Sequence, residues 1–173
     1  MKPSPTGVFK IARQGDAVYT RVVGLGTMNN SITFKEFGDQ QLGQGYRRFI
    51  IDLADCKGID STFMGILAGL AASARAHDKR PGSGVIIVNA NPHCRKQLES
   101  IGLHRIVTVQ NDPAALPAGL ELHELPESEA SPTARLKLIM RAHQELIAAD
   151  KKNEERFGAF LRDIAKNLGQ SPP

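Results

Sequence analysis

The sequence predicts an α/β fold in which helices pack on a mixed β-sheet, followed by a C-terminal helical extension. Across residues 8–125, apolar runs of strand length alternate with helical patterns, which is typical of a sheet covered by helices. Across residues 133–168, apolar residues instead recur along one side of a long helix. A chain of 173 residues is long enough for one compact domain with such an appendage.

The first elements are two strands that form a hairpin. Residues 8–13 and 17–23 are β-type runs, and the glycine-containing link at residues 14–16 has hairpin length. Because a hairpin opens the chain, the sheet is expected to be mixed rather than wholly parallel. Residues 24–27, which include two glycines, favour a loop.

A helix and a buried strand follow the hairpin. Residues 29–31 offer N-caps for a helix that ends near Gly43 or Gly45. Residues 47–53 have the apolar middle of a strand buried on both faces, and residues 55–58 have the composition of a turn.

The most informative stretch is residues 59–77, which has apolar residues at helical spacing and small residues on its other faces. Gly65 and Gly69 each lower helix stability by up to about 1 kcal/mol, and close packing of the helix on the sheet would offset that loss. The later elements expected are a strand at residues 85–88, a helix from Asn91 to Gly102, a strand at residues 106–109 and a short edge strand at residues 120–125.

The chain divides into a sheet domain at residues 1–126, a linker at residues 127–132 and an amphipathic helical extension at residues 133–168. Residues 150–155 are polar throughout, which favours a break or bend in the extension. Because an apolar stripe must be covered, we expect the extension to pack on its own domain or to form a homodimer with a second copy. Docking on a partner is the remaining alternative.

Composition and charge exclude several classes of protein. The net charge is +4, and residues 133–168 carry eight Lys/Arg and five Asp/Glu, a weak indication of anionic partners. The absence of tryptophan argues against a base-stacking surface, so nucleic acid is not expected as a partner. No apolar run reaches the roughly 20 residues of a membrane span, and the first residues lack the apolar stretch of a signal peptide. A cytoplasmic location is therefore expected.

The sequence contains no motif for catalysis, a metal or a cofactor, and we do not expect an enzyme. Cys56 and Cys94 have neither metal-ligand spacing nor the pattern of a disulfide framework, and both are expected to be reduced and structural. The spacing pairs no histidine with a nucleophile, although folding could do so. The histidines are His77, His93, His104, His123 and His143.

The strongest local feature is the polar start of the helix at residues 59–77. Asp60 and Ser61 directly follow the buried strand and its turn, and either side chain can cap this helix. Free N–H groups in the first turn make this end positive, so a phosphate on Ser61 would be well accommodated. An ordinary N-cap explains the same residues, and local physics alone favours that interpretation.

The stretch around this helix start resembles the STAS domain of bacterial anti-sigma-factor antagonists. Residues 49–53 (FIIDL) match the family's apolar strand ending in Asp-Leu, and residues 59–67 (IDSTFMGIL) match its Asp-Ser-Ser/Thr run before a helix. Residues 85–103 are similar to the family's next strand and helix, so the resemblance extends over about residues 8–110 in matching element order. It implies a STAS-like fold for residues 1–126.

The resemblance also implies a protein–protein switch without catalytic activity, in a bacterial stress or sigma-factor signalling pathway. Ser61 would be the phosphoacceptor, and Asp60, Thr62, Phe63 and Met64 would lie at the partner interface. The unphosphorylated form would bind a serine kinase that is also the anti-sigma factor, which frees the sigma factor, and a phosphatase would reset the cycle. The alternative is a constitutive STAS scaffold that has lost the switch.

Two departures from the family pattern bear on the switch. Phe63 stands where the family most often has glycine after the second hydroxyl residue. Residues 24–27 lack the aspartate that the family usually carries after its second strand, in a Gly-x-Leu-Asp setting. If that aspartate assists phosphorylation or kinase docking, either would be weakened in this chain.

Overall fold

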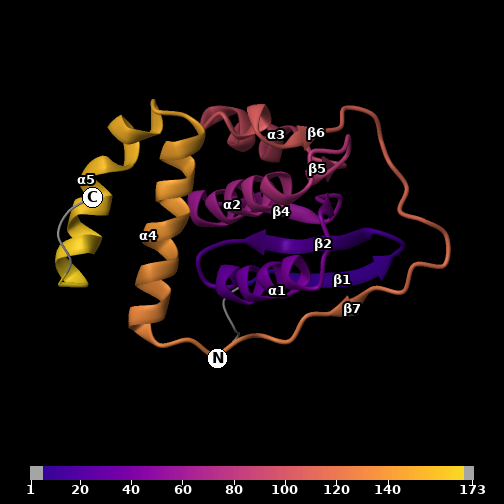
Figure 1. Ribbon diagram of the computed structural model, residues 1–173, viewed down its shortest axis with the longest axis horizontal. Helices are drawn as coiled ribbons and strands as arrows, with labels where there is room; N and C mark the ends of the chain where they lie inside the picture. Colours follow the sequence, from indigo (N-terminus) through magenta and orange to yellow (C-terminus); the bar gives the residue numbers. More distant parts are fainter. Residues whose placement is uncertain (1–5, 170–173) are drawn as a thin grey trace.

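The computed structural model describes residues 6–169, and its elements follow the predicted alternation (Figure 1). The strands are β1 (Val8–Gln14), β2 (Ala17–Gly26), β3 (Arg48–Asp52), β4 (Cys56–Ile59), β5 (Gly84–Val88), β6 (Thr108–Val109) and β7 (His123–Glu124). The helices are α1 (Ser31–Gly43), α2 (Ser61–His77), α3 (Pro92–Ser100), α4 (Pro132–Ala149) and α5 (Asn153–Asn167), with a 3-10 turn at Leu103–Arg105.

The described residues form a seven-stranded mixed sheet with the order β6-β5-β3-β2-β1-β7, and β4 adds to the end of β2. Strand β1 is antiparallel to both β2 and β7, whereas β2, β3, β5 and β6 run parallel. The register places Phe49 opposite both Val18 and Val85. The predicted mixed sheet, its opening hairpin and its short edge strand are confirmed.

The end of β2 differs from the prediction. Residues 24–27 were expected as a loop, but β2 continues to Gly26 and pairs with β4, which itself occupies part of the predicted turn. Gly24 has a φ of 81°, and the register shifts between Gly24 and Leu25. A residue without a Cβ permits this irregularity, so the glycines allow the strand to bend rather than end it.

The main core lies between the sheet and the helices on one of its faces. Phe9 from β1, Phe34 from α1 and Phe63 from α2 meet there, with ring centroids 5.3 to 5.5 Å apart. The opposite face carries a smaller apolar cluster around Ala17 and Ile50. The burial of Phe63 places the side chain that departs from the family pattern inside the core.

The C-terminal extension packs back on the domain as two helices. Helix α4 crosses α2, and α5 returns beside α4 after a break at residues 150–152, within the predicted polar segment (Figure 1). Ala142 and Leu146 of α4 belong to the main core. A Cβ added at Gly65 would lie 2.1 Å from the carbonyl oxygen of Ala142. Gly65 therefore allows close packing of α2 against α4, and not against the sheet as the sequence suggested.

The predicted linker is tied to the domain. Its backbone N–H at Ser128 donates to Oγ1 of Thr33 in α1, at 2.9 Å. It ends at Ser131, whose hydroxyl caps α4 by accepting from the N–H of Ala134, and Pro132 is the first residue of the helix. The start of α4 is thereby fixed near α1, from where the helix runs across α2.

Candidate functional site

Asp60 holds the start of α2 in place. Its Oδ1 accepts from the backbone N–H of Phe63 at 2.9 Å, which makes Asp60 the N-cap of the helix. Its Oδ2 accepts from the N–H of Met28 at 2.8 Å, so the same carboxylate also fixes the segment between β2 and α1. The expected capping role of this pair of residues therefore belongs to Asp60, and Ser61 follows as the first helical residue with its hydroxyl free for another partner.

The partner of Ser61 comes from the C-terminal extension. The Oγ of Ser61 lies 2.9 Å from Nε2 of His143 in α4, although the two residues are 82 positions apart. The Nδ1 of His143 lies 2.7 Å from the carbonyl oxygen of Ile139, one helical turn earlier. Because a carbonyl can only accept, Nδ1 carries the proton in the neutral ring, and Nε2 accepts from the Ser61 hydroxyl.

His143 is neutral for a physical reason. The side chain is 3% exposed, and its ring lies edge-on to Phe157 and Phe160 of α5, with centroids 4.7 and 5.0 Å away. Burial lowers the pKa of His143 from its usual 6.5, against smaller opposing effects from the Ile139 carbonyl and the Asp60 carboxylate. The site is thus a serine hydroxyl hydrogen-bonded to an oriented, uncharged imidazole.

The structure separates the residues predicted for the partner interface. Thr62, Phe63 and Met64 are buried in the domain and present no side chain to a partner. Asp60 and Ser61 are half-buried and remain at the surface. Of the five residues singled out from the sequence, these two can contribute side chains to a docking surface.

Two exposed apolar side chains lie beside this pair. Met28, whose N–H bonds to Asp60, is 47% exposed, and Phe160, whose ring contacts His143, is 45% exposed. Within residues 6–169 they are the two large apolar side chains that are exposed. Exposed aromatic and methionine side chains are enriched where proteins bind other proteins.

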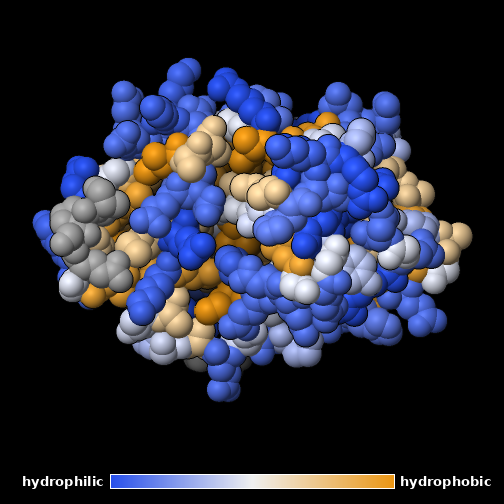
Figure 2. Space-filling model, in the orientation of Figure 1, coloured by the Kyte–Doolittle hydropathy of each residue, from blue (hydrophilic) through white to orange (hydrophobic). Residues whose placement is uncertain are grey.

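A separate groove lies between α1, α2 and α4. The residues that line it include Gly65, Gly69 and Leu138, together with the charged Arg141 and Glu145. Figure 2 shows apolar surface at this junction, surrounded by hydrophilic side chains. Ser61 does not line the groove, so it is distinct from the hydroxyl–imidazole pair.

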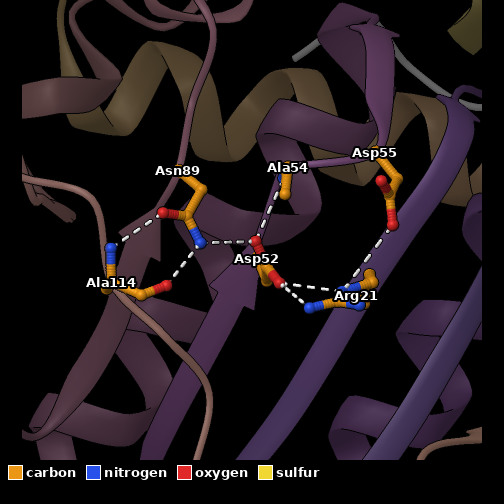
Figure 3. A network of polar contacts seen from close by, with 6 residues as sticks. All are labelled: Arg21, Asp52, Ala54, Asp55, Asn89 and Ala114. Atoms are coloured by element: carbon orange, nitrogen blue, oxygen red, sulfur yellow. Dashed lines mark hydrogen bonds and ion pairs between the residues drawn. The ribbon is translucent and has the colours of Figure 1, made fainter.

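A second polar cluster is buried at the end of β3. The carboxylate of Asp52 accepts from Nε and Nη2 of Arg21, both at 2.8 Å, from Nδ2 of Asn89 at 2.9 Å and from the N–H of Ala54 at 3.0 Å (Figure 3). Asn89 also exchanges hydrogen bonds with the backbone of Ala114. This network links β2, β3 and the segments after β5 and β6.

The cysteines are buried, unbridged and adjacent. The Sγ atoms of Cys56 in β4 and Cys94 in α3 lie 3.9 Å apart. The hydrogen bond with Cys94, together with backbone hydrogen bonds to Gly58 and Gly26, lowers the pKa of Cys56 against the opposing effect of burial. The same thiol pairing and burial raise the pKa of Cys94. The sequence did not indicate that they would meet.

Metal ligands and membrane-spanning helices are the two remaining features to consider in the described part of the chain. Over residues 6–169, no group of three or more His, Cys, Asp or Glu residues is arranged to hold a metal ion. Over the same range, no helix has the length and apolar character needed to cross a bilayer.

Sequence reasoning found Ser61 and missed its partner. His143 lies on the apolar stripe of the extension, and in α4 that stripe is the face that packs on α2. A single histidine inside an apolar stripe must satisfy its ring nitrogens after burial. That requirement was the available signal, but nothing local identified Ser61 as the group that meets it.

Comparisons with known proteins concern the sheet domain. The sequence model of the STAS domain family matches residues 9–115. A Thermotoga maritima protein assigned to the anti-sigma factor antagonists is similar in structure, with 23% identity, a TM-score of 0.54 and coverage of 60% of this chain and 86% of its own. The anti-sigma factor antagonist SpoIIAA in its unphosphorylated form has 17% identity, a TM-score of 0.53 and coverage of 60% and 89%.

An anti-sigma factor antagonist from Mycobacterium paratuberculosis is also similar in structure, with 15% identity, a TM-score of 0.51 and coverage of 63% of this chain and 89% of its own. No curated protein matches the sequence significantly. The family match ends before α4 and α5 begin. Ser61 therefore lies inside the matched segment and His143 outside it.

Proposed function

The chain belongs to the STAS domain family, and from this membership we propose that it is an anti-sigma-factor antagonist controlled by phosphorylation of Ser61. The unphosphorylated protein binds a serine kinase that is also an anti-sigma factor, and a phosphatase restores that form. The observation that carries the proposal is the position of Ser61, which is half-buried and is the first residue of α2. We propose no catalytic turnover by this chain itself.

The start of α2 is suited to a phosphorylated side chain. The backbone N–H groups of Ser61 and Thr62 have no acceptor within residues 6–169, because the Asp60 cap takes the N–H of Phe63. Unsatisfied N–H groups at a helix N-terminus favour a bound phosphate. Phosphorylation adds a charge of about −1.5 to −2, which would oppose binding of a partner that covers this face.

The surface around Ser61 supports a protein partner. Met28 and Phe160 offer exposed apolar contacts beside the polar Asp60 and Ser61. Apolar anchor residues surrounded by polar groups are typical of protein interfaces. A phosphate between them would have to be desolvated on binding, so one modification at Ser61 would be sufficient to separate the two proteins.

Intact mass spectrometry after incubation with the partner kinase and Mg·ATP tests the proposal. The wild-type protein is expected to gain one phosphate, and Ser61→Ala none. Thr62→Val is the matched control, because this neighbouring hydroxyl residue is buried and its loss should leave the phosphate in place. The unphosphorylated protein should bind the kinase, and the protein phosphorylated on Ser61 should not.

The competing function is a constitutive STAS scaffold, and two observations favour it. The Ser61 hydroxyl already has a hydrogen-bond partner in α4, and residues 24–27 contain no acid. A wild-type protein that binds the kinase but never gains a phosphate would select the scaffold and contradict the switch.

A further inference from the structure

The contact between Ser61 and His143 has the arrangement of an activated nucleophile. The three parts are a hydroxyl, an imidazole nitrogen 2.9 Å away that accepts its proton, and a third group, the Ile139 carbonyl, that fixes the ring. A hydroxyl hydrogen-bonded through its proton keeps its oxygen lone pairs available for attack.

We propose that His143 is the general base for phosphoryl transfer to Ser61. This inference rests on the proposed function, in which Ser61 is the phosphoacceptor. As the bond between Oγ and phosphorus forms, the bond from phosphorus to the bridging oxygen of ATP on the partner kinase breaks, and ADP leaves. The hydroxyl proton passes to Nε2 of His143, which becomes an imidazolium.

The product state is also stabilised by this arrangement. The new phosphate lies beside a positively charged ring and at the start of α2, where the N–H groups of Ser61 and Thr62 face no other acceptor in the described residues. Both contacts favour the phosphorylated serine over the free hydroxyl. The C-terminal extension thus supplies the acid–base group, whereas the STAS domain supplies the nucleophile.

The surroundings of the ring are suited to a base that is neutral before transfer. The side chains in contact with it include Ser61 from α2 and Phe157 and Phe160 from α5, and the charged group that acts on its pKa is the Asp60 carboxylate. Burial holds the pKa of His143 below 6.5, so Nε2 is free to accept a proton at neutral pH. The position of His143 outside the family match makes this role a property of the extension.

The test uses diisopropyl fluorophosphate, a phosphorylating reagent that needs no kinase. In this reaction the Oγ–P bond forms, the P–F bond breaks, fluoride leaves and the proton goes to Nε2. Labelling of the full chain is followed by intact mass, and the site is located by peptide mapping. The wild type should be labelled at Ser61, and His143→Gln should be labelled about 100-fold more slowly.

The choice of glutamine separates a base from a structural partner. Its amide oxygen can still accept from the Ser61 hydroxyl but cannot take the proton. His77→Gln, which changes an exposed histidine of α2, should react as the wild type does. The wild-type rate should rise with pH through the pKa of His143, measured by NMR of the ring, and this step should be absent in His143→Gln.

Equal rates for wild type and His143→Gln would overturn the assignment, and so would faster labelling of the variant, which would make His143 a lock on the hydroxyl. If His143→Gln does not fold, the wild-type profile decides, and a rate that is flat across the His143 titration overturns the assignment. Kinase-dependent phosphate on Ser61 without any role for His143 would leave the proposed switch intact. His143-dependent labelling without kinase-dependent phosphate would contradict the switch and retain the base.

Discussion

The Asp52 cluster and the Ser61–His143 pair are two polar sites of the chain that differ in how completely their hydrogen-bonding capacity is used. Asp52 is 1% exposed, and both of its oxygens accept two hydrogen bonds (Figure 3). The Ser61 hydroxyl is half-buried and has one partner in the described residues, a neutral ring. The Asp52 carboxylate, with both oxygens fully engaged, links neighbouring strands, whereas the Ser61 hydroxyl keeps lone pairs free for the phosphoryl transfer that we propose.

The largest effect on stability is expected when the Asp52 cluster is disrupted. Asp52→Ala removes the carboxylate that pairs with Arg21 and leaves the amide of Asn89 without one partner. We expect a loss of about 3 kcal/mol in the free energy of unfolding, at the low end for buried pairs because Arg21 is partly exposed. Urea denaturation measures it.

The control for that change is Asp55→Ala. Its carboxylate lies 3.8 Å from Nε of Arg21 and is exposed, so its removal should cost less than about 1 kcal/mol. Similar losses for both variants would show that Asp52 acts as an ordinary surface charge.

The next largest effect is expected from separating Ser61 from His143. Gly65→Ala places a Cβ against the backbone of Ala142, so α4 must move away from α2. We expect a loss of about 1–3 kcal/mol, together with loss of the Ser61–His143 hydrogen bond, which NMR of the ring nitrogens detects.

Gly43→Ala is the matched glycine, because a Cβ at this last residue of α1 would meet nothing within 4 Å. It should leave stability unchanged or raise it by less than about 1 kcal/mol. If Gly65→Ala were equally harmless, the close contact of α2 and α4 would not be what positions His143.

A smaller change in stability is expected at Phe160, the exposed aromatic residue that contacts His143. Phe160→Ala removes a ring that is 45% exposed, so thermal or urea denaturation should show a loss of only about 1 kcal/mol. Binding to the partner kinase should weaken by more than the loss of stability explains. Unchanged binding would remove Phe160 from the proposed docking surface.

The smallest effect is the pH dependence of stability contributed by His143. Burial lowers its pKa in the folded protein below the 6.5 of an exposed histidine, so the unfolded chain binds more protons in that range. Stability is therefore complete above about pH 6.5 and falls as the pH drops toward the folded pKa.

His143→Gln should remove that part of the acid sensitivity. The comparison is the free energy of unfolding of both proteins, measured by urea denaturation above and below pH 6.5. Identical pH dependence in wild type and variant would contradict the inferred neutral state of the buried ring.

The sequence predicted those parts of the fold that depend on local periodicity. The helix at residues 59–77 and the buried strand before it could be predicted because their apolar spacing is visible within a short stretch of sequence. Strand β4 was missed because its partner, the glycine-rich end of β2, lies about 30 residues earlier and has the local composition of a loop.

For the same reason, only one of the two residues of the candidate site could be predicted. Ser61 stands in a recognisable motif, but its partner His143 is 82 positions away, on a helix whose docking face was clear and whose docking place was not. Cys56 and Cys94 also meet across distant segments. Periodicity identifies which side of a helix is buried, and it carries no information about which residue lies opposite.

The two ends of the sheet restrict how this chain can associate with others. Strands β6 and β7 consist of two residues each, Thr108–Val109 and His123–Glu124. Such short edge strands offer few unpaired backbone groups of their own, and on β7 the charge of Glu124 opposes the addition of a strand from another molecule. Association of copies through their sheet edges is therefore disfavoured, and we expect contacts with other proteins at the helical surfaces.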